Sequence, residues 1–418
     1  MTATTNPFLR YRERLDSYRA VADGRLPDER FVELVIGLDE AVAAIEGHGF
    51  ATTPVVEAVE LAAAISPGLE LWVKDETGNV AGSHKARHLF GTAVGLLVDG
   101  ALGPPRAERG SDGRLAIASC GNAALAAGVV AAAMERPLEV FVPTWADDAI
   151  VERLTGLGAT VTRCPRREGE AGDPAYRRFR EAVETGARPF SVTGTDTPTA
   201  FDGGRTLGWE LADQVPGGVD RDDRLFLQVG GGALATSVSL AAPEARLFPV
   251  QTEGCAPLRR AWDRLAPGFD FDAAAASPDD YMWAWEAEPH SAATGILDDV
   301  TYDWLPLLRR TRASGGEPIV VAEALVLRAN ELARAHTSIP VSVTGTAGLA
   351  GLLAAAETGP VDGRALVAFT GIDHHAVDRP RPVPPIGVSR RRRSAGGRPP
   401  WPGPSPAPGP SPRGSRGR

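Results

Sequence analysis

Lysine is almost absent from this chain, and both of its lysines lie in the segment 71–87. Lys74 and Lys85 stand against 42 arginines. Arginine replaces lysine as a surface charge but not as a nucleophile, because the guanidinium stays protonated under ordinary conditions. A lysine kept in such a composition is a candidate for Schiff-base chemistry with a carbonyl group. Codon bias with chance is the alternative, and the neighbouring motifs decide between the two.

Lys85 ends the segment Gly-Ser-His-Lys at 82–85, directly before a helix predicted over 86–98. The N–H groups at a helix N-terminus favour an anion such as a phosphate, and their field also helps to keep the amine unprotonated. A solvated loop lysine is the alternative interpretation. The position therefore combines a nucleophile with a place for an anion.

A second turn joins a strand predicted over 115–119 to a helix predicted over 123–134. Ser119, Cys120 and the first N–H groups of the helix could hold a carboxylate, and Asn122 offers an amide to an aromatic oxygen. Taken alone, a turn with serine and asparagine is more often a helix N-cap.

Two more turns carry candidate groups. Gly230, Gly231 and Gly232 follow a strand predicted over 224–229 and precede a helix from about Ala233, and three glycines let the backbone curl around a phosphate. This turn is neither a Walker loop nor a dinucleotide fingerprint. Further on, a strand predicted over 341–343 presents Thr344, whose hydroxyl could meet a ring nitrogen or cap the next helix.

Strands and helices alternate along most of the chain. The alternation predicts an α/β fold with parallel sheets, whose ligands bind at the carboxyl ends of the strands. Amphipathic helices are predicted within 8–48. The other predicted strands cover 69–74, 138–142, 160–163, 247–251 and 365–369, and the other predicted helices cover 150–157, 176–184, 206–214, 322–335 and 347–356.

The composition is that of a globular protein, with 43% apolar and 23% charged residues. The longest apolar run, 123–134, is too short to cross a bilayer, and the N-terminus lacks the apolar core of a signal peptide. Three scattered cysteines indicate neither a disulfide framework nor a zinc site. We expect a cytoplasmic protein that binds no membrane.

The C-terminal segment 379–418 differs from the rest. It holds ten arginines, twelve prolines and no Asp or Glu, so the other residues carry −19 against −9 for the whole chain. An acidic body is a poor candidate for nucleic-acid binding. The segment cannot bury a core and should be disordered. It is either a dispensable extension or a basic arm for an acidic partner.

In this order and spacing, the four turns resemble those of the fold-type II pyridoxal-phosphate enzymes, the tryptophan synthase β-like superfamily. That group includes threonine synthase, threonine and serine dehydratases, diaminopropionate ammonia-lyase and cysteine synthase. The resemblance covers about residues 50–375, and the family's lysine motif matches 82–87. The stretches 53–54, 202–210 and 249–257 look most like threonine synthase and its lyase relatives.

The resemblance implies a role for each matched residue. Lys85 would hold pyridoxal 5'-phosphate as a Schiff base, with His84 near the phosphate and Asn122 facing the phenolic oxygen. Two departures are His84, where threonine synthases usually have phenylalanine, and Ala233, where a fourth glycine is usual. The remaining implied roles are the substrate carboxylate site at Ser119, Cys120, Gly121 and Ala123, the phosphate loop at Gly230, Gly231, Gly232 and Ala233, and the pyridine partner at Thr344, with Thr346 as the fallback.

The resemblance also implies a two-domain architecture and a homodimer. Residues 1–77 and 197–378 would form the cofactor-binding domain, and 78–196 the smaller substrate-side domain. The implied activity is a lyase or synthase that eliminates or replaces at the β or γ carbon of a small amino acid. A non-catalytic protein that binds the cofactor or an amino acid is the alternative, and an interaction protein acting through its basic tail is a third.

Overall fold

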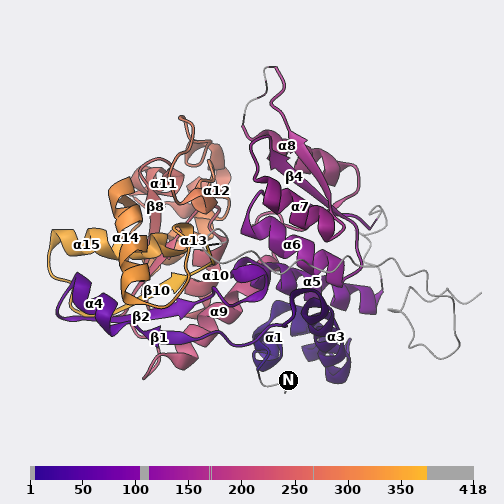
Figure 1. Ribbon diagram of the computed structural model, residues 1–418, viewed down its shortest axis with the longest axis horizontal. Helices are drawn as coiled ribbons and strands as arrows, with labels where there is room; N and C mark the ends of the chain where they lie inside the picture. Colours follow the sequence, from indigo (N-terminus) through magenta and orange to yellow (C-terminus); the bar gives the residue numbers. More distant parts are fainter. Residues whose placement is uncertain (1–4, 104–112, 169, 171, 267, 374–418) are drawn as a thin grey trace, which may run out of the picture.

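The computed structural model describes residues 5–103, 113–168, 170, 172–266 and 268–373, and the statements below concern these residues. They form two sheets flanked by helices, which confirms the predicted α/β class. Figure 1 shows one unit on the left that carries the larger sheet, and another on the right in which the smaller sheet stands above the N-terminal helices.

The larger sheet has six strands, and all neighbouring pairs are parallel except β1 with β2. Its central strand is buried on both faces, because Ala365, Val367 and Phe369 face one helical layer while Leu366 and Ala368 face the other. The strands in sheet order are β1 (Val55–Glu57), β2 (Leu69–Asp75), β10 (Gly363–Phe369), β7 (Arg224–Gln228), β8 (Arg246–Thr252) and β9 (Ile319–Val321).

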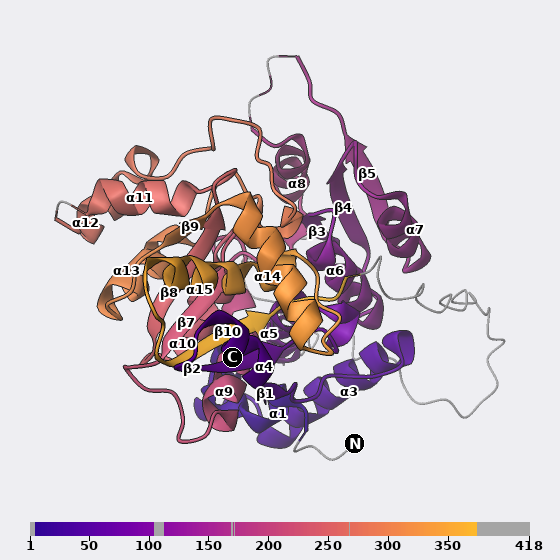
Figure 2. The same cartoon turned by 60° about the vertical axis from the view of Figure 1, so that its left-hand side comes forward.

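Helices cover both faces of this sheet. Figure 2 shows α14 and α15 crossing in front of its strands, and α4 joins them in one hydrophobic cluster. The helices on this face are α4 (Val59–Ile65), α14 (Glu323–His336) and α15 (Ala347–Thr358). Those on the other are α9 (Ala200–Gln214), α10 (Ala233–Ala241), α11 (Pro257–Leu265), α12 (Phe271–Ala276) and α13 (Trp304–Ala313).

The smaller sheet has four parallel strands. In sheet order they are β5 (Thr160–Cys164), β4 (Leu138–Pro143), β3 (Leu115–Ala118) and β6 (Arg188–Pro189). The helices around it are α5 (Lys85–Leu102), α6 (Asn122–Ala133), α7 (Asp148–Gly156) and α8 (Pro174–Glu184).

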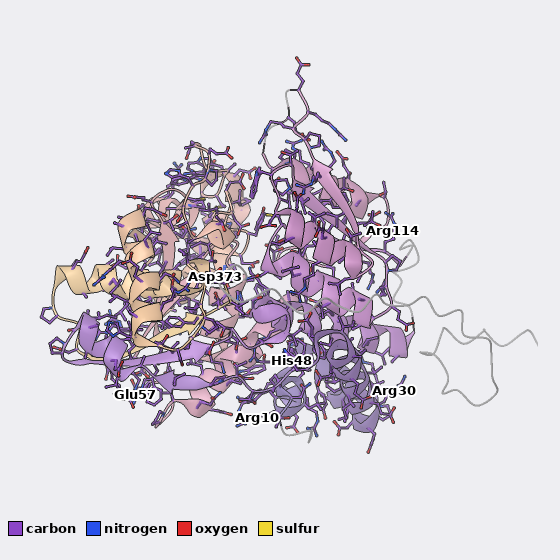
Figure 3. All side chains as sticks on the ribbon, in the orientation of Figure 1. Arg10, Arg30, His48, Glu57, Arg114 and Asp373 are labelled. Carbon is purple, nitrogen blue, oxygen red and sulfur yellow. The ribbon has the colours of Figure 1, made fainter. Side chains whose placement is uncertain are left out.

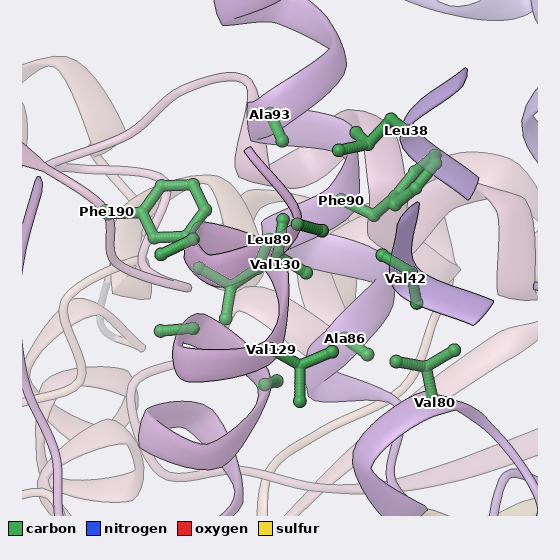
Figure 4. Packing of buried hydrophobic residues seen from close by; sticks show 14 of the residues in the cluster. Leu38, Val42, Val80, Ala86, Leu89, Phe90, Ala93, Val129, Val130 and Phe190 are labelled. Atoms are coloured by element: carbon green, nitrogen blue, oxygen red, sulfur yellow. The ribbon is translucent and has the colours of Figure 1, made fainter. Parts of the chain in front are cut away.

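The N-terminal helices α1 (Pro7–Arg10), α2 (Arg19–Ala22) and α3 (Asp28–Glu46) pack on α5 and α6. Figure 4 shows Leu38 and Val42 of α3 near Phe90 of α5 and Val129 of α6. All four side chains are fully buried. The division into domains at 77, 196 and 378 stays a prediction.

Helices α5 and α9 cross in backbone contact. A Cβ atom added at Gly203 would lie 1.7 Å from the carbonyl oxygen of Arg87, and one added at Gly91 would lie 2.5 Å from the nitrogen of Gly203. Both distances are far below van der Waals contact, so only glycine fits at either position. The first turn of α5, which carries Lys85, is thereby held directly against α9.

A buried ionic network lies beside this crossing. Lys74 Nζ donates to Glu210 Oε2 and to the carbonyl oxygen of Thr53, both at 2.6 Å. Arg87 donates to Glu76 Oε2 at 2.8 Å and to both oxygens of Glu210, at 2.8 and 2.9 Å. The two cations and two carboxylates are at most 1% exposed. Lys74 is therefore a structural residue at the end of β2.

The long strands and helices lie within about four residues of their predicted bounds, except that α9 begins six residues earlier, at Ala200. The predicted strand at 341–343 is wrong, because only Val341 forms a bridge, to Ile372, and a 3-10 helix follows at Thr344–Thr346. Three short strands, β1, β6 and β9, and the helices α4, α11, α12 and α13 were not predicted.

The C-terminal segment 379–418, for which disorder was predicted, lies outside the described residues. No helix in the described ranges is long and apolar enough to cross a membrane.

Candidate active site

A large cavity lies between the two sheets and contains all of the predicted site residues. Asp373, labelled near the middle of Figure 3, is part of its lining. The turns after β3, β7 and β10 open into it, as expected for the carboxyl ends of parallel strands. The predicted residues that line it are His84, Lys85, Ser119, Cys120, Gly121, Asn122, Ala123, Gly230, Gly231, Gly232, Ala233 and Thr344.

Lys85 is the first residue of α5, and its amine has no hydrogen bond or ion pair within the described part of the chain. Burial lowers the pKa of Lys85, and Asp298 and Asp303 partly offset this. The loop before the helix contains Ala81 at φ +53°, a conformation that costs a non-glycine residue free energy. The chain thus places a half-buried amine with a lowered pKa against the cavity.

His84 is anchored to the end of β10. Its Nδ1 lies 3.0 Å from the carbonyl oxygen of Thr370, and a carbonyl can only accept, so Nδ1 carries the proton. Burial, with Lys85 and His88 adding to it, lowers the pKa of His84 well below its ordinary value. The neutral ring then presents a lone pair at Nε2 and cannot donate a hydrogen bond to a phosphate. Its role near the phosphate stays a prediction.

The turn from β3 into α6 presents small polar groups to the cavity. Gly121 N–H lies 3.4 Å from Ser119 Oγ, and the first N–H groups of α6 have no intrahelical acceptor. Asn122 reaches across to the segment that follows β10, since its Nδ2 lies 2.8 Å from the position of a Cβ on Gly371. Burial raises the pKa of the Cys120 thiol, which is therefore neutral. The turn suits an anion such as a carboxylate.

A carboxyl group of the chain, that of Asp298, lies against the glycine turn. Gly231 N–H is hydrogen-bonded to the carboxylate of Asp298, and Asp298 Oδ2 lies 2.3 Å from the position of a Cβ on Gly230. Gly232 has φ +103°, which strongly favours glycine. The glycines leave room for an anion, and the N–H groups at the start of α10 would hold the phosphate of pyridoxal phosphate there. Asp298 would have to give up the Gly231 N–H to it or be protonated.

Two threonines were candidates for the pyridine nitrogen, and they lie differently. Thr344 lines the cavity, and its Oγ1 accepts from Gly295 N–H at 3.1 Å, which leaves its own proton free. Thr346 is fully buried, and its hydroxyl donates to the carbonyl oxygen of Val343. It does not belong to the cavity lining.

The hydroxyl of Thr370 is a third candidate, which the sequence did not lead us to predict. Thr370 directly follows β10 and is 3% exposed, and its Oγ1 accepts from Gln228 Nε2 at 2.7 Å while the residue lines the cavity. The signal was present in the sequence, since a strand was predicted over 365–369 and ligands bind after such strands. Thr370 therefore joins Thr344 as a hydroxyl that can donate into the cavity.

An acidic and aromatic wall was also missed. Asp173 and Tyr176 belong to α8 and its N-cap, and Asp298, Asp299 and Tyr302 belong to the loop before α13. The two tyrosine rings face each other with centroids 5.4 Å apart. Burial raises the pKa of each of the last three groups, and Asp173 raises all three further. Nothing in the sequence pattern of this irregular loop pointed to it.

Comparison with known proteins identifies the family of the chain. A family model described as "Pyridoxal-phosphate dependent enzyme" matches residues 48–371. The L-serine dehydratase of Saccharomyces cerevisiae is 26% identical over 208 residues, which is 47% of this chain and 60% of that protein. The serine dehydratase-like protein of Rattus norvegicus is 30% identical over 189 residues, 44% of this chain and 50% of that protein. The chain thus spans about half the length of these curated relatives.

Solved structures share the fold. The processed form of threonine deaminase isoform 2 from Solanum lycopersicum aligns with a TM-score of 0.59 and 16% identity over 83% of this chain and 86% of that one. Maize serine racemase aligns with a TM-score of 0.57 and 21% identity over 82% and 94% of the two chains. A pyridoxal 5'-phosphate-dependent aspartate racemase aligns with a TM-score of 0.60 and 19% identity over 82% of this chain and 97% of that one.

Proposed function

Because the chain belongs to the pyridoxal-phosphate-dependent enzyme family, we propose that it is an ammonia-lyase that carries out β-elimination on a small amino acid. One observation carries the proposal. Lys85, whose amine has no partner among the described residues, faces a cavity that also contains an anion-binding turn at 119–123 and a glycine turn at 230–232. A nucleophile, a carboxylate site and a phosphate site are what the reaction requires.

Lys85 has two successive tasks in this reaction. Its amine would hold the cofactor covalently, and the same Nζ, when free, would take the proton from the substrate α carbon. Burial supports both tasks, because it lowers the pKa of Lys85 and so increases the neutral fraction of the amine. Pyridoxal phosphate, when bound, supplies the electron sink that makes this α-proton acidic enough to remove.

The other residues of the site would bind and orient the substrate and the cofactor. The Ser119–Ala123 turn would hold the substrate carboxylate on the first N–H groups of α6, which fixes the α carbon relative to Lys85. Gly230–Gly232 would hold the cofactor phosphate, and Asn122 its phenolic oxygen. Departure of the β substituent with its bonding electrons leaves an enamine, which water converts to a 2-oxo acid and ammonia.

A neutral hydroxyl beside the pyridine nitrogen favours elimination. A hydroxyl leaves this nitrogen less protonated than a carboxylate would, which weakens the sink and suppresses transamination. Thr344 is our proposed partner, and Thr370 is the competing one because it also has a free proton and lines the cavity.

Two other functions are separable from this one. Replacement of the threonine synthase type needs cations for a substrate phosphate. In the described lining the only arginines are Arg153, which pairs with Glu46 at 2.8 Å, and Arg166, which donates to the carbonyl oxygens of Glu170 and Gly172. This part of the lining thus offers no free arginine for a substrate phosphate, which argues against replacement of the threonine synthase type. A non-catalytic member would bind the cofactor without turnover.

The test uses the purified, cofactor-loaded protein with L-serine and L-threonine. We expect a 2-oxo acid and ammonia in equal amounts, and a loss of at least about a thousandfold in Lys85→Ala, because nucleophile and base disappear together. Lys85→Arg is the matched control, since it keeps the charge but not the nucleophile, and it should be equally inactive. Cofactor binding without turnover of any small amino acid would support the non-catalytic alternative. Sedimentation would measure the homodimer that the resemblance implies.

A further inference from the structure

The segment that leads into Lys85 has an unfavourable backbone conformation. Ala81 has φ +53° and ψ +22°, in the left-handed region that disfavours a side chain, and it is 1% exposed. Gly82 follows with φ +68°. Because Lys85 lies only four residues after Ala81, a change of conformation at Ala81 would redirect the start of α5. The segment therefore needs contacts from outside that fix it.

The residues after β10 hold one side of this segment. The carbonyl oxygen of Gly82 accepts from Ile372 N–H at 2.9 Å, and His84 N–H donates to the carbonyl oxygen of Thr370 at 3.0 Å. Both bonds hold residues that follow Ala81. The N–H of Ala81 itself is held by a different part of the chain.

Glu46, the last residue of α3, holds the other side. Its Oε2 accepts from Ala81 N–H at 3.2 Å, and its Oε1 accepts from Arg153 of α7 at 2.8 Å. The Glu46 side chain is only 10% exposed. Val80, next to Ala81, packs in the same hydrophobic cluster as Val42 of α3 (Figure 4). The end of α3 thus supports the segment through a hydrogen bond and through apolar packing.

Helix α3 itself gives no reason for a carboxylate at position 46. The dipole disfavours a negative charge at the C-terminus of a helix, and the last turn of α3 has no basic residue. Arg153 of α7 supplies the compensating charge. Glu46 also precedes the residues 48–371 that the family model matches, so that match does not account for it. Its two partners explain the carboxylate, and one of them is the backbone of the segment before Lys85.

We propose that Glu46 is a positioning residue that acts on Lys85 through the backbone of Ala81. This inference rests on the proposed function, which assigns Lys85 as nucleophile and base. The Lys85 amine has no hydrogen bond within the described part of the chain, so the influence of Glu46 runs through the peptide chain between them. Without the carboxylate, Ala81 would leave the left-handed region, and the first turn of α5 would move with it.

Acetylation of the full-length chain without cofactor tests this inference without any turnover. The N-terminal amine serves as internal standard, and peptide mapping separates it from Lys85 and Lys74. We expect Glu46→Ala to lower the rate at Lys85 at least about threefold at neutral pH, because burial lowers the pKa of Lys85 and a displaced amine in water would regain its proton. The rate at Lys74, which is buried and paired with Glu210, should stay unchanged.

The variant Ala81→Gly separates positioning from general stability. Glycine adopts the left-handed conformation without strain, so the double variant should recover most of the Lys85 rate that Glu46→Ala loses. Glu46→Gln should lose less than Glu46→Ala, because its amide oxygen still accepts from Ala81 N–H. Glu40→Ala is the matched control, since Glu40 is an exposed residue of the same helix, and its rate should equal that of the wild type.

On the loaded enzyme, Glu46→Ala should lower kcat about tenfold with little change in KM, because the displaced group is the base and the carboxylate site at 119–123 is left in place. Two results would overturn the inference while leaving the proposed reaction intact: an unchanged acetylation rate at Lys85 in Glu46→Ala, or a loss that Ala81→Gly does not reduce. If no small amino acid is turned over, the proposed reaction fails, and the acetylation rates alone decide on Glu46.

Discussion

Replacing Glu210 by glutamine should destabilise the protein far more than its small change in shape suggests. Glu210 accepts from Lys74 Nζ at 2.6 Å and from Arg87 at 2.8 and 2.9 Å, and it is fully buried. Burial raises its pKa, but Arg87 and Lys74 lower it more, and the net result is a lowered pKa. The carboxylate is therefore charged in the native protein.

The expected cost follows from the charge count. The network holds two cations, Lys74 and Arg87, and two anions, Glu76 and Glu210, so it is neutral as a unit. Glutamine leaves one buried positive charge without compensation, and breaking a buried pair in this way costs about 3–5 kcal/mol. Glutamine has nearly the same volume, so no cavity term is added.

The deficit should depend on pH. Burial lowers the pKa of Lys74, and Glu210 is the largest influence that raises it, so the substitution lowers this pKa further. The unfolded chain then binds a proton that the folded variant lacks. Its stability therefore rises with pH between the folded and unfolded pKa values of the lysine, by up to about 1.4 kcal/mol per pH unit. The wild-type lysine shows the same rise from its own, higher folded pKa, so the deficit should shrink as the pH rises through the interval between the two folded pKa values.

Urea unfolding of the loaded protein over a range of pH measures the free energy lost in Glu210→Gln and how that loss depends on pH. Asp272→Asn is the matched control, because the Arg309–Asp272 pair at 2.8 Å is exposed and should contribute no more than about 1 kcal/mol. If Glu210→Gln costs no more than this control, or if its deficit grows as the pH rises, the network is not the charge-balanced unit described above.

Borohydride reduction of the loaded protein, followed by peptide mapping, should place the cofactor on Lys85; a label on Lys74, which is buried and paired, would contradict the mechanism. Thr344→Asp should protonate the pyridine nitrogen and raise transamination relative to elimination, and product analysis would instead favour Thr370 if only Thr370→Asp has this effect. Removing 379–418 should leave the unfolding midpoint and turnover unchanged, because its composition cannot form a core, and a loss of either would reveal docking on the acidic body.

The sequence was sufficient for the parts of the fold that depend on local pattern. The buried strand at 365–369 and the turns at 119–123 and 230–232 were predicted because apolar runs, glycines and capping residues follow one another along the chain. The strand at 341–343 was wrong because its alternating Val-Ser-Val looks extended. In the structure these residues instead turn toward Gly371, with Ser342 N–H donating to its carbonyl oxygen.

The parts that could not be predicted depend on distant segments. Asp298 reaches Gly231 from a loop without periodicity, and Tyr302 meets Tyr176 of the other half. Lys74 could be assigned to a strand end, but its partner Glu210 lies 136 residues away. Such pairings follow from how the two sheets come together, which no single window of sequence records.

The crossing of α5 and α9 has a mechanical consequence. Helices usually interlock through ridges and grooves of side chains, which resist sliding. At Gly91 and Gly203 the two backbones meet without side chains between them, and His88 beside them packs on Gly204 with its Nδ1 2.8 Å from the carbonyl oxygen of Ala200. Arg87 adds an ion pair with Glu210 and a hydrogen bond to Thr206. Any movement of α9 would therefore carry the first turns of α5 with it, and with them the backbone of Lys85.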